Sequence, residues 1–162
     1  MPFEVAIPSI EAALRALLVA ESSLTVLIAT KPTAKGGGPA IYQDGEVPTG
    51  QTFPYLTIGA WTQTKFHRFS PQGSPGEGSG WGWNCTGVIK AIGQLAGGKT
   101  ETTLQNVMTE VFGALPEGER LTVDGYTSAW VDEWNLQPVI KTTLNNITTL
   151  EVPAIIRVYV CD

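Results

Sequence analysis

The chain has 162 residues, of which 43% are hydrophobic and 15% are charged, and its formal net charge is −5. This length and apolar content fit a single domain spanning residues 1–162 with one core. The acidic balance excludes a protein that grips the phosphate backbone of a nucleic acid, because such a surface needs clustered lysine and arginine. The charged fraction is below the ~25% of typical soluble domains, which suggests that partners cover part of the surface.

The first segment predicts an amphipathic helix. Pro8 and Ser9 open it, and Ser9 is the expected cap residue. Glu11 and Arg15 are spaced to form a pair on the outer face of this helix. The apolar stripe at helical spacing consists of Ile10, Ala13, Leu14, Leu17 and Leu18.

Short apolar segments and glycine-rich connections follow the helix. Residues 24–28 are expected to form a helical turn, and residues 31–40, with three successive glycines, predict a flexible loop. Ile41 and Tyr42 then form a brief apolar anchor. Residues 53–61 alternate in the manner of a β-strand, and the proline near the start of this segment is tolerated there.

Residues 62–80 show no clear periodicity, and their second half is rich in glycine, serine and proline. A connection this long inside a compact domain is usually functional or disordered. We expect a flexible hairpin arm that leads into a strand at residues 81–92. Basic and aromatic residues in the arm also suggest nucleic-acid binding, but the negative net charge does not suit a DNA grip and favours a hairpin arm whose base continues the strands. The expected contact residues are Lys65, Phe66, His67, Arg68, Phe69 and Trp81.

Residues 93–100 fit the phosphate-binding spacing G-x-x-x-x-G-K-[ST], with Gly93, Gly98, Lys99 and Thr100 at the defining positions. In such a loop, backbone N–H groups surround phosphates, the lysine supplies charge and the hydroxyl holds Mg²⁺. A nucleotide-binding enzyme that uses this loop is therefore one alternative. The other is a glycine-rich turn from strand to helix, with Thr100 as the helix cap.

Three features weigh against the nucleotide loop. Only about 60 residues follow Thr100, which is room for about two further βαβ units at ~30 residues each. The preceding strand, residues 86–92, alternates between apolar and polar positions, whereas a central parallel strand is apolar on both faces. An acidic residue should close a second apolar strand to help bind Mg²⁺, and the one candidate, Asp162, is the last residue of the chain.

The remaining chain predicts a second helix and then a β-rich region. Residues 102–115 carry an apolar stripe at helical spacing. Asp124-Gly125 is a strong hairpin signal, and Asn145-Asn146 is another turn candidate. Closing strands are expected at residues 147–152 and 154–161, separated by a proline that marks a sheet edge or a bulge.

The rest of the sequence argues against specialised chemistry. Cys85 and Cys161 lie in expected strands and are interpreted as buried thiols, although a disulfide is possible if those strands are neighbours. A single histidine, His67, cannot form a metal site or a catalytic triad alone. No cofactor is therefore expected. Glu4 does not fit a secretory leader, and no apolar run approaches the ~20 residues of a membrane span.

The order of elements resembles the tail terminator, or tail completion, proteins of long-tailed bacteriophages. The resemblance covers most of the chain through several short segments: an opening helix and its apolar continuation at residues 10–28, the Ile41-Tyr42 anchor, the Pro-Tyr strand at residues 53–58, the strand at residues 86–92 and the helix at residues 102–115. The triple-glycine loop and the Gly-Gly-Lys-Thr turn depart from the family pattern.

The resemblance implies an α+β fold, a mostly antiparallel sheet covered by two helices with a long hairpin arm. It further implies a non-enzymatic virion protein, assembled in the host cytoplasm, that forms a hexameric ring on the tail tube. The ring would stop tube polymerisation and contact the head completion or connector protein. DNA would pass through without specific binding, as suits an acidic protein. The alternatives are the nucleotide-binding enzyme, another connector or tail tube component, and a generic host α+β binding domain.

Overall fold

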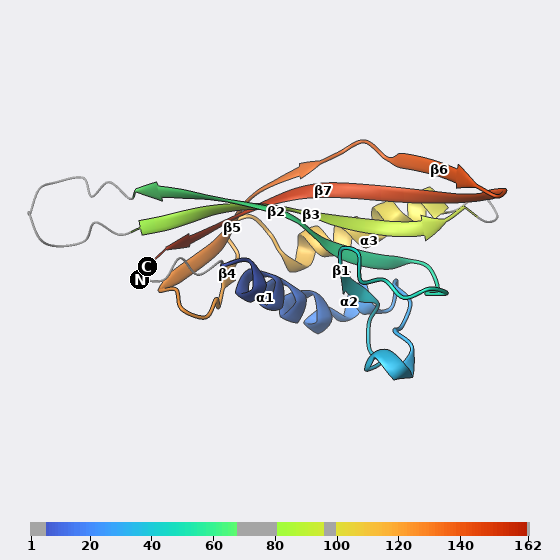
Figure 1. Ribbon diagram of the computed structural model, residues 1–162, viewed down its shortest axis with the longest axis horizontal. Coiled ribbons are helices and arrows are strands. Elements are labelled where there is room, and N and C mark those ends of the chain that lie inside the picture. Colours follow the sequence, from blue (N-terminus) through green and yellow to red (C-terminus); the bar gives the residue numbers. More distant parts are fainter. Residues whose placement is uncertain (1–5, 68–80, 96–99, 162) are drawn as a thin grey trace, which may run out of the picture.

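The computed structural model describes residues 6–67, 81–95 and 100–161, and these residues form an α+β fold. A curled, mostly antiparallel sheet of seven strands has its two main helices on one face (Figure 1). The helical elements are α1 (Ile7–Ala20), α2 (Ser22–Thr25), the 3₁₀ turn η1 (Thr33–Lys35) and α3 (Thr100–Ala114). The strands are β1 (Ile41–Gln43), β2 (Tyr55–His67), β3 (Trp81–Gln94), β4 (Arg120–Leu121), β5 (Ser128–Leu136), β6 (Ile140–Leu144) and β7 (Ile147–Cys161). The predicted fold class is confirmed.

The strands are arranged in the order β1-β2-β3-β7-β5-β4, and β6 pairs with β7 beyond the end of β5. Only β1 and β2 run parallel; the other pairs are antiparallel. β5 and β6 therefore lie end to end along the long strand β7 (Figure 1). This arrangement makes β3 and β7 the centre of the sheet.

Pro153 lies inside β7, so the two closing strands expected from the sequence are one strand of 15 residues. The pairing of β7 with β3 passes Pro153 without a register shift. On the other side, the backbone N–H of Gln137 donates to the carbonyl oxygen of Pro153 (2.9 Å) in the gap between β5 and β6. Proline has no N–H. The side of Pro153 on which an N–H would lie faces this gap, where no hydrogen bond to a neighbouring strand is needed. The expected edge or bulge is thus a break in the neighbouring strands instead.

The apolar stripes of α1 and α3 pack on the sheet, as predicted. Ile10, Leu14 and Leu18 of α1 are fully buried, as are Leu104 and Val107 of α3. They meet the apolar face of the central strands, which includes Leu56, Ile58, Cys85, Ile89, Ala154, Ile156 and Val158. The core therefore lies between the helices and one face of the sheet.

Two predictions about α1 are wrong. The helix begins at Ile7 with Ala6 as its cap, so Ser9 lies inside the first turn and does not cap it. Glu11 is not on the outer face but is 8% exposed, and its carboxylate accepts a hydrogen bond from Trp61. The reason is an inserted residue in β2, described below, that turns a tryptophan toward the helix.

The base of the predicted arm is confirmed. β2 continues to His67 and pairs antiparallel with β3, and the last pair described is His67 with Trp81. Residues 68–80, which include Arg68, Phe69 and the expected tip, lie outside the described residues. The structure thus supports two strands leading into this segment.

Both predicted turns and the predicted thiols are present. Asn145 and Asn146 have positive φ angles of 50° and 62° and join β6 to β7, which is the geometry of a two-residue hairpin turn. Gly125, with φ 85°, lies in the connection between β4 and β5. Cys85 and Cys161 are buried free thiols on neighbouring strands. Cys85 is opposite Val158, three residues from Cys161, so the two cysteines do not face each other.

Candidate functional site

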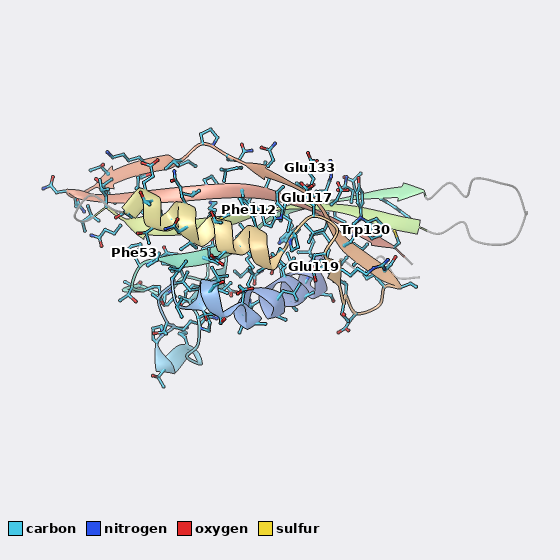
Figure 2. The ribbon with its side chains drawn as sticks, turned by 180° about the vertical axis from the view of Figure 1, so that it is seen from behind. Phe53, Phe112, Glu117, Glu119, Trp130 and Glu133 are labelled. Atoms are coloured by element: carbon cyan, nitrogen blue, oxygen red, sulfur yellow. The ribbon has the colours of Figure 1, made fainter. Side chains whose placement is uncertain are left out.

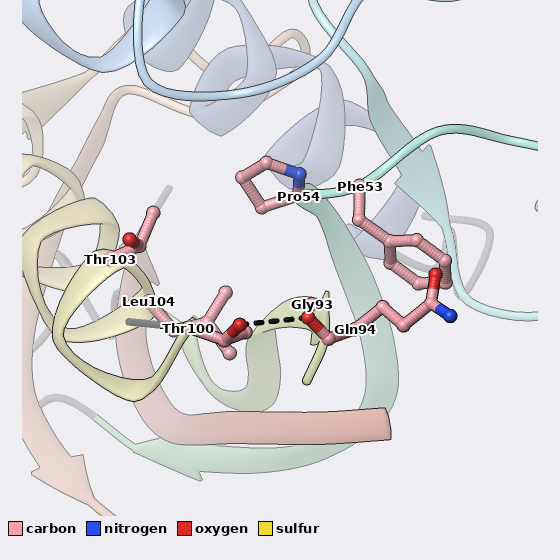
Figure 3. Close-up of a pocket in the computed structure, with 7 residues that line it drawn as sticks. All are labelled: Phe53, Pro54, Gly93, Gln94, Thr100, Thr103 and Leu104. Atoms are coloured by element: carbon pink, nitrogen blue, oxygen red, sulfur yellow. Dashed lines mark hydrogen bonds between the residues drawn. The ribbon is translucent and has the colours of Figure 1, made fainter. Parts of the chain in front are cut away.

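The turn from β3 to α3 has an environment unlike that of a nucleotide loop. β3 has antiparallel partners on both sides, β2 and β7, whereas a phosphate-binding loop follows a strand of a parallel sheet. Thr100 is the first residue of α3, so it is not the cap, and its hydroxyl donates to the carbonyl oxygen of Gln94 at 2.8 Å (Figure 3). Gly98 and Lys99 lie outside the described residues.

The described residues at this turn enclose a small hollow. It is lined by Phe53, Pro54, Gly93, Gln94, Thr100, Thr103 and Leu104 and has a volume of about 190 Å³ (Figure 3). Sites for drug-sized ligands usually measure ~300–1,000 Å³. The described part of its lining is largely apolar.

Gly93 has a packing role in this turn. A Cβ atom built on Gly93 would lie 2.9 Å from the Cγ2 atom of Thr100 and 3.0 Å from a methyl group of Leu104. The absence of a side chain lets the first turn of α3 approach the end of β3. The glycine of the motif is therefore explained by helix–sheet packing and not by phosphate binding.

The predicted contact residues at the base of the arm are only partly described. Lys65 lies directly opposite Trp83 in the β2–β3 pair, and its ammonium nitrogen is 5.7 Å from the centre of the indole ring. The backbone places Phe66 opposite Gly82. Of the side chains of Phe66, His67 and Trp81 nothing is described, so their contact role stays a prediction. Trp83 is partly buried and packs against the core.

A β-bulge in β2 creates a polar contact that sequence reasoning missed. The register shifts between Gly59 and Thr62, so that two residues of β2 oppose Gly87 of β3, and Ala60 adopts a positive φ of 53°. The bulge moves Trp61 to the helix-covered face. There its Nε1–H donates to the Glu11 carboxylate at 2.7 Å.

Burial in this contact raises the pKa of the Glu11 carboxyl above its usual value. The hydrogen bond from Trp61 and the charge of Arg15 oppose the increase but do not cancel it, and Glu46 adds to it. Among the described residues, Glu11 belongs to no cluster of three or more side chains that could hold a metal ion. We interpret this contact as structural.

A second bulge, in β5, directs two carboxylates to one guanidinium on the sheet face without helices. The register between β5 and β7 shifts between Val131 and Glu133. As a result Asp132 binds Arg157 Nε at 2.6 Å, and Glu133 binds the Nη2 atom of the same arginine. The ring of Tyr159 lies next to Arg157 and contacts Trp130 with a centroid separation of 5.6 Å. This face therefore carries an arginine that is held by two carboxylates beside the ring of Tyr159.

Three glutamates lie close to one another in the β4–β5 region. Figure 2 shows Glu117, Glu119 and Glu133 on the same part of the molecule, beside Trp130. Glu117 accepts from the backbone N–H of Trp134, and the indole of Trp134 donates to the carbonyl oxygen of Leu115 at 2.7 Å. These bonds fix the end of α3 to β5.

The described residues contain no group of three or more His, Cys, Asp or Glu side chains placed to hold a metal ion. Within the same part of the chain, no helix has both the length and the apolar character needed to cross a bilayer.

No protein-family model and no curated protein sequence matches the chain. Its fold is similar to that of a chain in a solved structure described as "Virion of native gene transfer agent (GTA) particle". The TM-score is 0.58 at 17% sequence identity, and the match covers 96% of this chain and 98% of that chain. At this identity the similarity establishes the fold, over nearly the whole length of both chains.

Proposed function

We propose that this chain is a structural protein of a phage-like particle and, within it, the tail terminator. The observation that carries the proposal is the fold similarity to a chain of a gene transfer agent virion over 96% of this chain. A match over nearly the whole length of both chains supports a shared role as one building block, acting as a single domain. The order of elements, which resembles the tail terminator family, supports the finer assignment.

In this role the chain forms a ring, with six subunits expected from the family resemblance, at the end of the tail tube. The ring stops tube polymerisation and presents a surface to the head completion or connector protein. Subunits of a ring meet head to tail, so each needs two different complementary surfaces. The net charge of −5 suits a channel through which DNA must pass without adhering.

The base of the arm supplies one contact surface for a neighbouring subunit or for the tail tube. Lys65 is exposed next to Trp83 at the end of the long β2–β3 pair. The remaining proposed contacts are Phe66, His67, Arg68, Phe69 and Trp81. Aromatic and basic side chains of this kind dominate the energetics of protein interfaces.

The test is to add the purified protein to polymerising tail-tube subunits of the same particle and to measure tube lengths by electron microscopy. A terminator halts elongation at substoichiometric amounts, whereas a tube protein adds length and a connector leaves the tubes unchanged. Either of the latter results would overturn the assignment. Lys65→Glu should weaken capping, while Lys35→Glu, a change at an exposed lysine in η1, should not.

A further inference from the structure

Two basic side chains near the β1 edge of the sheet have no acidic partner. Arg15 lies in α1, and Lys31 lies in the connection between α2 and η1, with its Nζ atom 5.0 Å from the centre of the Tyr42 ring. Among the described residues, neither basic side chain forms an ion pair with a carboxylate. The Nε atom of Arg15 is buried and has no hydrogen-bond partner. An unsatisfied buried donor costs free energy, so an acceptor from outside the subunit would stabilise this guanidinium.

Arg15 and Lys31, called here the cation pair, are close enough to influence each other. Burial, and then the charge of Arg15, lower the pKa of the Lys31 ammonium below its usual value. Two carboxylates lie in the same region. That of Glu11 accepts the Trp61 indole N–H, and Glu46 is exposed and near enough to help raise the pKa of Glu11. Neither contacts the cation pair as an ion-pair partner, so a bound carboxylate would relieve the repulsion between the two cations.

A fixed turn presents two carboxylates elsewhere on the molecule. Glu117 and Glu119 flank Gly118 directly before β4, and Glu117 is exposed while Glu119 is half-buried. The N–H of Gly118 donates to the carbonyl oxygen of Val131 at 2.7 Å, and the N–H of Val131 donates to the carbonyl oxygen of Glu119 at 2.9 Å. Within the part of the chain that the structure describes, neither glutamate forms an ion pair. The turn therefore holds two unneutralised negative charges on a rigid backbone.

The two charged surfaces belong to opposite edges of the sheet. In the strand order, β1 is first and β4 is last, and these strands lie on either side of α1 (Figure 1). The cation pair is next to β1, and the glutamate turn leads into β4. A surface that complements a different part of the same chain generates a head-to-tail contact, which closes into a ring or continues as a filament.

We propose that the cation pair of one subunit, Arg15 and Lys31, binds the carboxylates of Glu117 and Glu119 of a second copy. A guanidinium binds a carboxylate through two parallel hydrogen bonds, and a lysine ammonium adds a compact charge. Each copy offers one cation pair and one glutamate turn, so the same contact repeats around the ring. This inference rests on the proposed function, because a head-to-tail contact is what a ring of identical subunits requires.

Zero-length coupling tests the contact directly. A carbodiimide joins an ammonium group to a carboxylate where the two are in contact, so it is applied to rings assembled from equal amounts of unlabelled and heavy-nitrogen-labelled chains. After digestion, mass spectrometry should find mixed-label peptides that join Lys31 to Glu117 or Glu119. Lys35, an exposed lysine in η1, is the internal control and should not couple to either glutamate. Coupling of Lys31 between copies to other carboxylates only, or to none, would overturn the proposal.

Charge reversal measures the same contact in solution. Lys31→Glu and Glu119→Lys should each weaken self-association about ten-fold or more by sedimentation, since each brings like charges together. The double variant should recover most of that loss, because unlike charges again meet between copies. Lys35→Glu is the matched control and should leave self-association unchanged. Urea denaturation of each variant separates a lost contact from a lost fold, and where a variant does not fold, the coupling of the wild-type chain decides.

The outcomes separate this contact from the proposed function. Rings that form on the tail tube, lack the Lys31 cross-links and tolerate both charge reversals would show that the contact is wrong while the proposed function stands. If the wild-type chain neither self-associates nor caps tubes, the proposed function fails and this contact fails with it.

Discussion

The indole of Trp61 donates a hydrogen bond to the carboxylate of Glu11 at 2.7 Å, and this bond joins the first helix to the sheet. The acceptor is 8% exposed and would lose its partner without the indole N–H. Trp61→Phe should therefore lower the free energy of unfolding by about 1–3 kcal/mol, since it leaves a buried acceptor unsatisfied. Urea denaturation measures this loss. Trp130→Phe, at a half-buried indole on the other face, should cost less, and equal losses would contradict the assigned role.

The elevated pKa of Glu11 gives this carboxyl a defined effect on the pH dependence of stability. Its pKa is raised in the folded protein, so the folded state holds the proton more tightly than the unfolded state. The contribution of Glu11 to stability is then present below the unfolded pKa and is lost as pH rises through the folded pKa. Glu11→Gln should gain stability relative to the wild type between pH 4 and pH 7, measured by urea denaturation at several pH values. A constant difference across this range would contradict the prediction.

The ring of Trp61 packs so close to Gly87 that a side chain at position 87 has no room. A Cβ atom at position 87 would lie 2.6 Å from the indole carbons, inside a strand paired on both sides. Gly87→Ala should destabilise the protein by about 1–3 kcal/mol, because a well-packed core adapts poorly to extra volume. Gly113→Ala is the matched control: nothing lies within 4 Å of its added carbon, and it lies in α3. There the change should stabilise by about 0.5–1 kcal/mol. Thermal unfolding of both variants checks the contrast.

The thiols of Cys85 and Cys161 should not react with thiol reagents in the native protein. Burial raises the pKa of the Cys85 thiol to about 12, so almost no reactive thiolate forms at pH 8. Cys161 is 1% exposed in the same sheet. We expect neither cysteine to react with an aromatic disulfide reagent in native buffer and both to react in denaturant. Rapid reaction of one thiol in native buffer would indicate that its strand opens locally.

The glycine-rich turn before α3 should not bind nucleotide. A fluorescent ATP analogue titrated with Mg²⁺ should give no saturable signal at micromolar concentrations, in the wild type or in Lys99→Ala. The antiparallel neighbours of β3 and the hydrogen bond of the Thr100 hydroxyl to Gln94 are the reasons. Saturable binding that is lost in Lys99→Ala would reverse this conclusion and support an enzyme.

The parts of the fold that could be predicted from the sequence are those that depend on neighbouring residues. Stripes at helical spacing located α1 and α3, and the Asp-Gly and Asn-Asn pairs located the two turns. Gly125 and Asn145 have the positive φ angles that such turns require. The parallel pairing of β1 with β2 was not predicted, since it depends on residues distant in the sequence. The burial of Glu11 was not predicted for the same reason. It depends on Trp61, which a bulge in the distant strand β2 turns toward α1.

The candidate interaction surface was only partly visible in the sequence. The base of the arm was identified through its basic and aromatic residues, but the exposed apolar side chains of Ile140, Leu144 and Ile147 were not singled out. The signal in the sequence was the segment Val139 to Leu144, directly before the Asn-Asn turn, in which four of the six residues are β-branched. Because apolar strand residues are usually buried, only the three-dimensional arrangement shows that every residue of β6 is exposed.

The gap that Pro153 faces has a further consequence for how this protein can vary. Since the proline offers no N–H, the ladder is already interrupted between Leu136 and Ile140, and β3 continues past it undisturbed. Extra residues accommodated after Gln137 would leave the sheet bonds of β5 and β6 intact. Relatives with longer connections at this point, or a peptide tag grafted there, can therefore retain the same core while differing in the outline they present to neighbouring proteins.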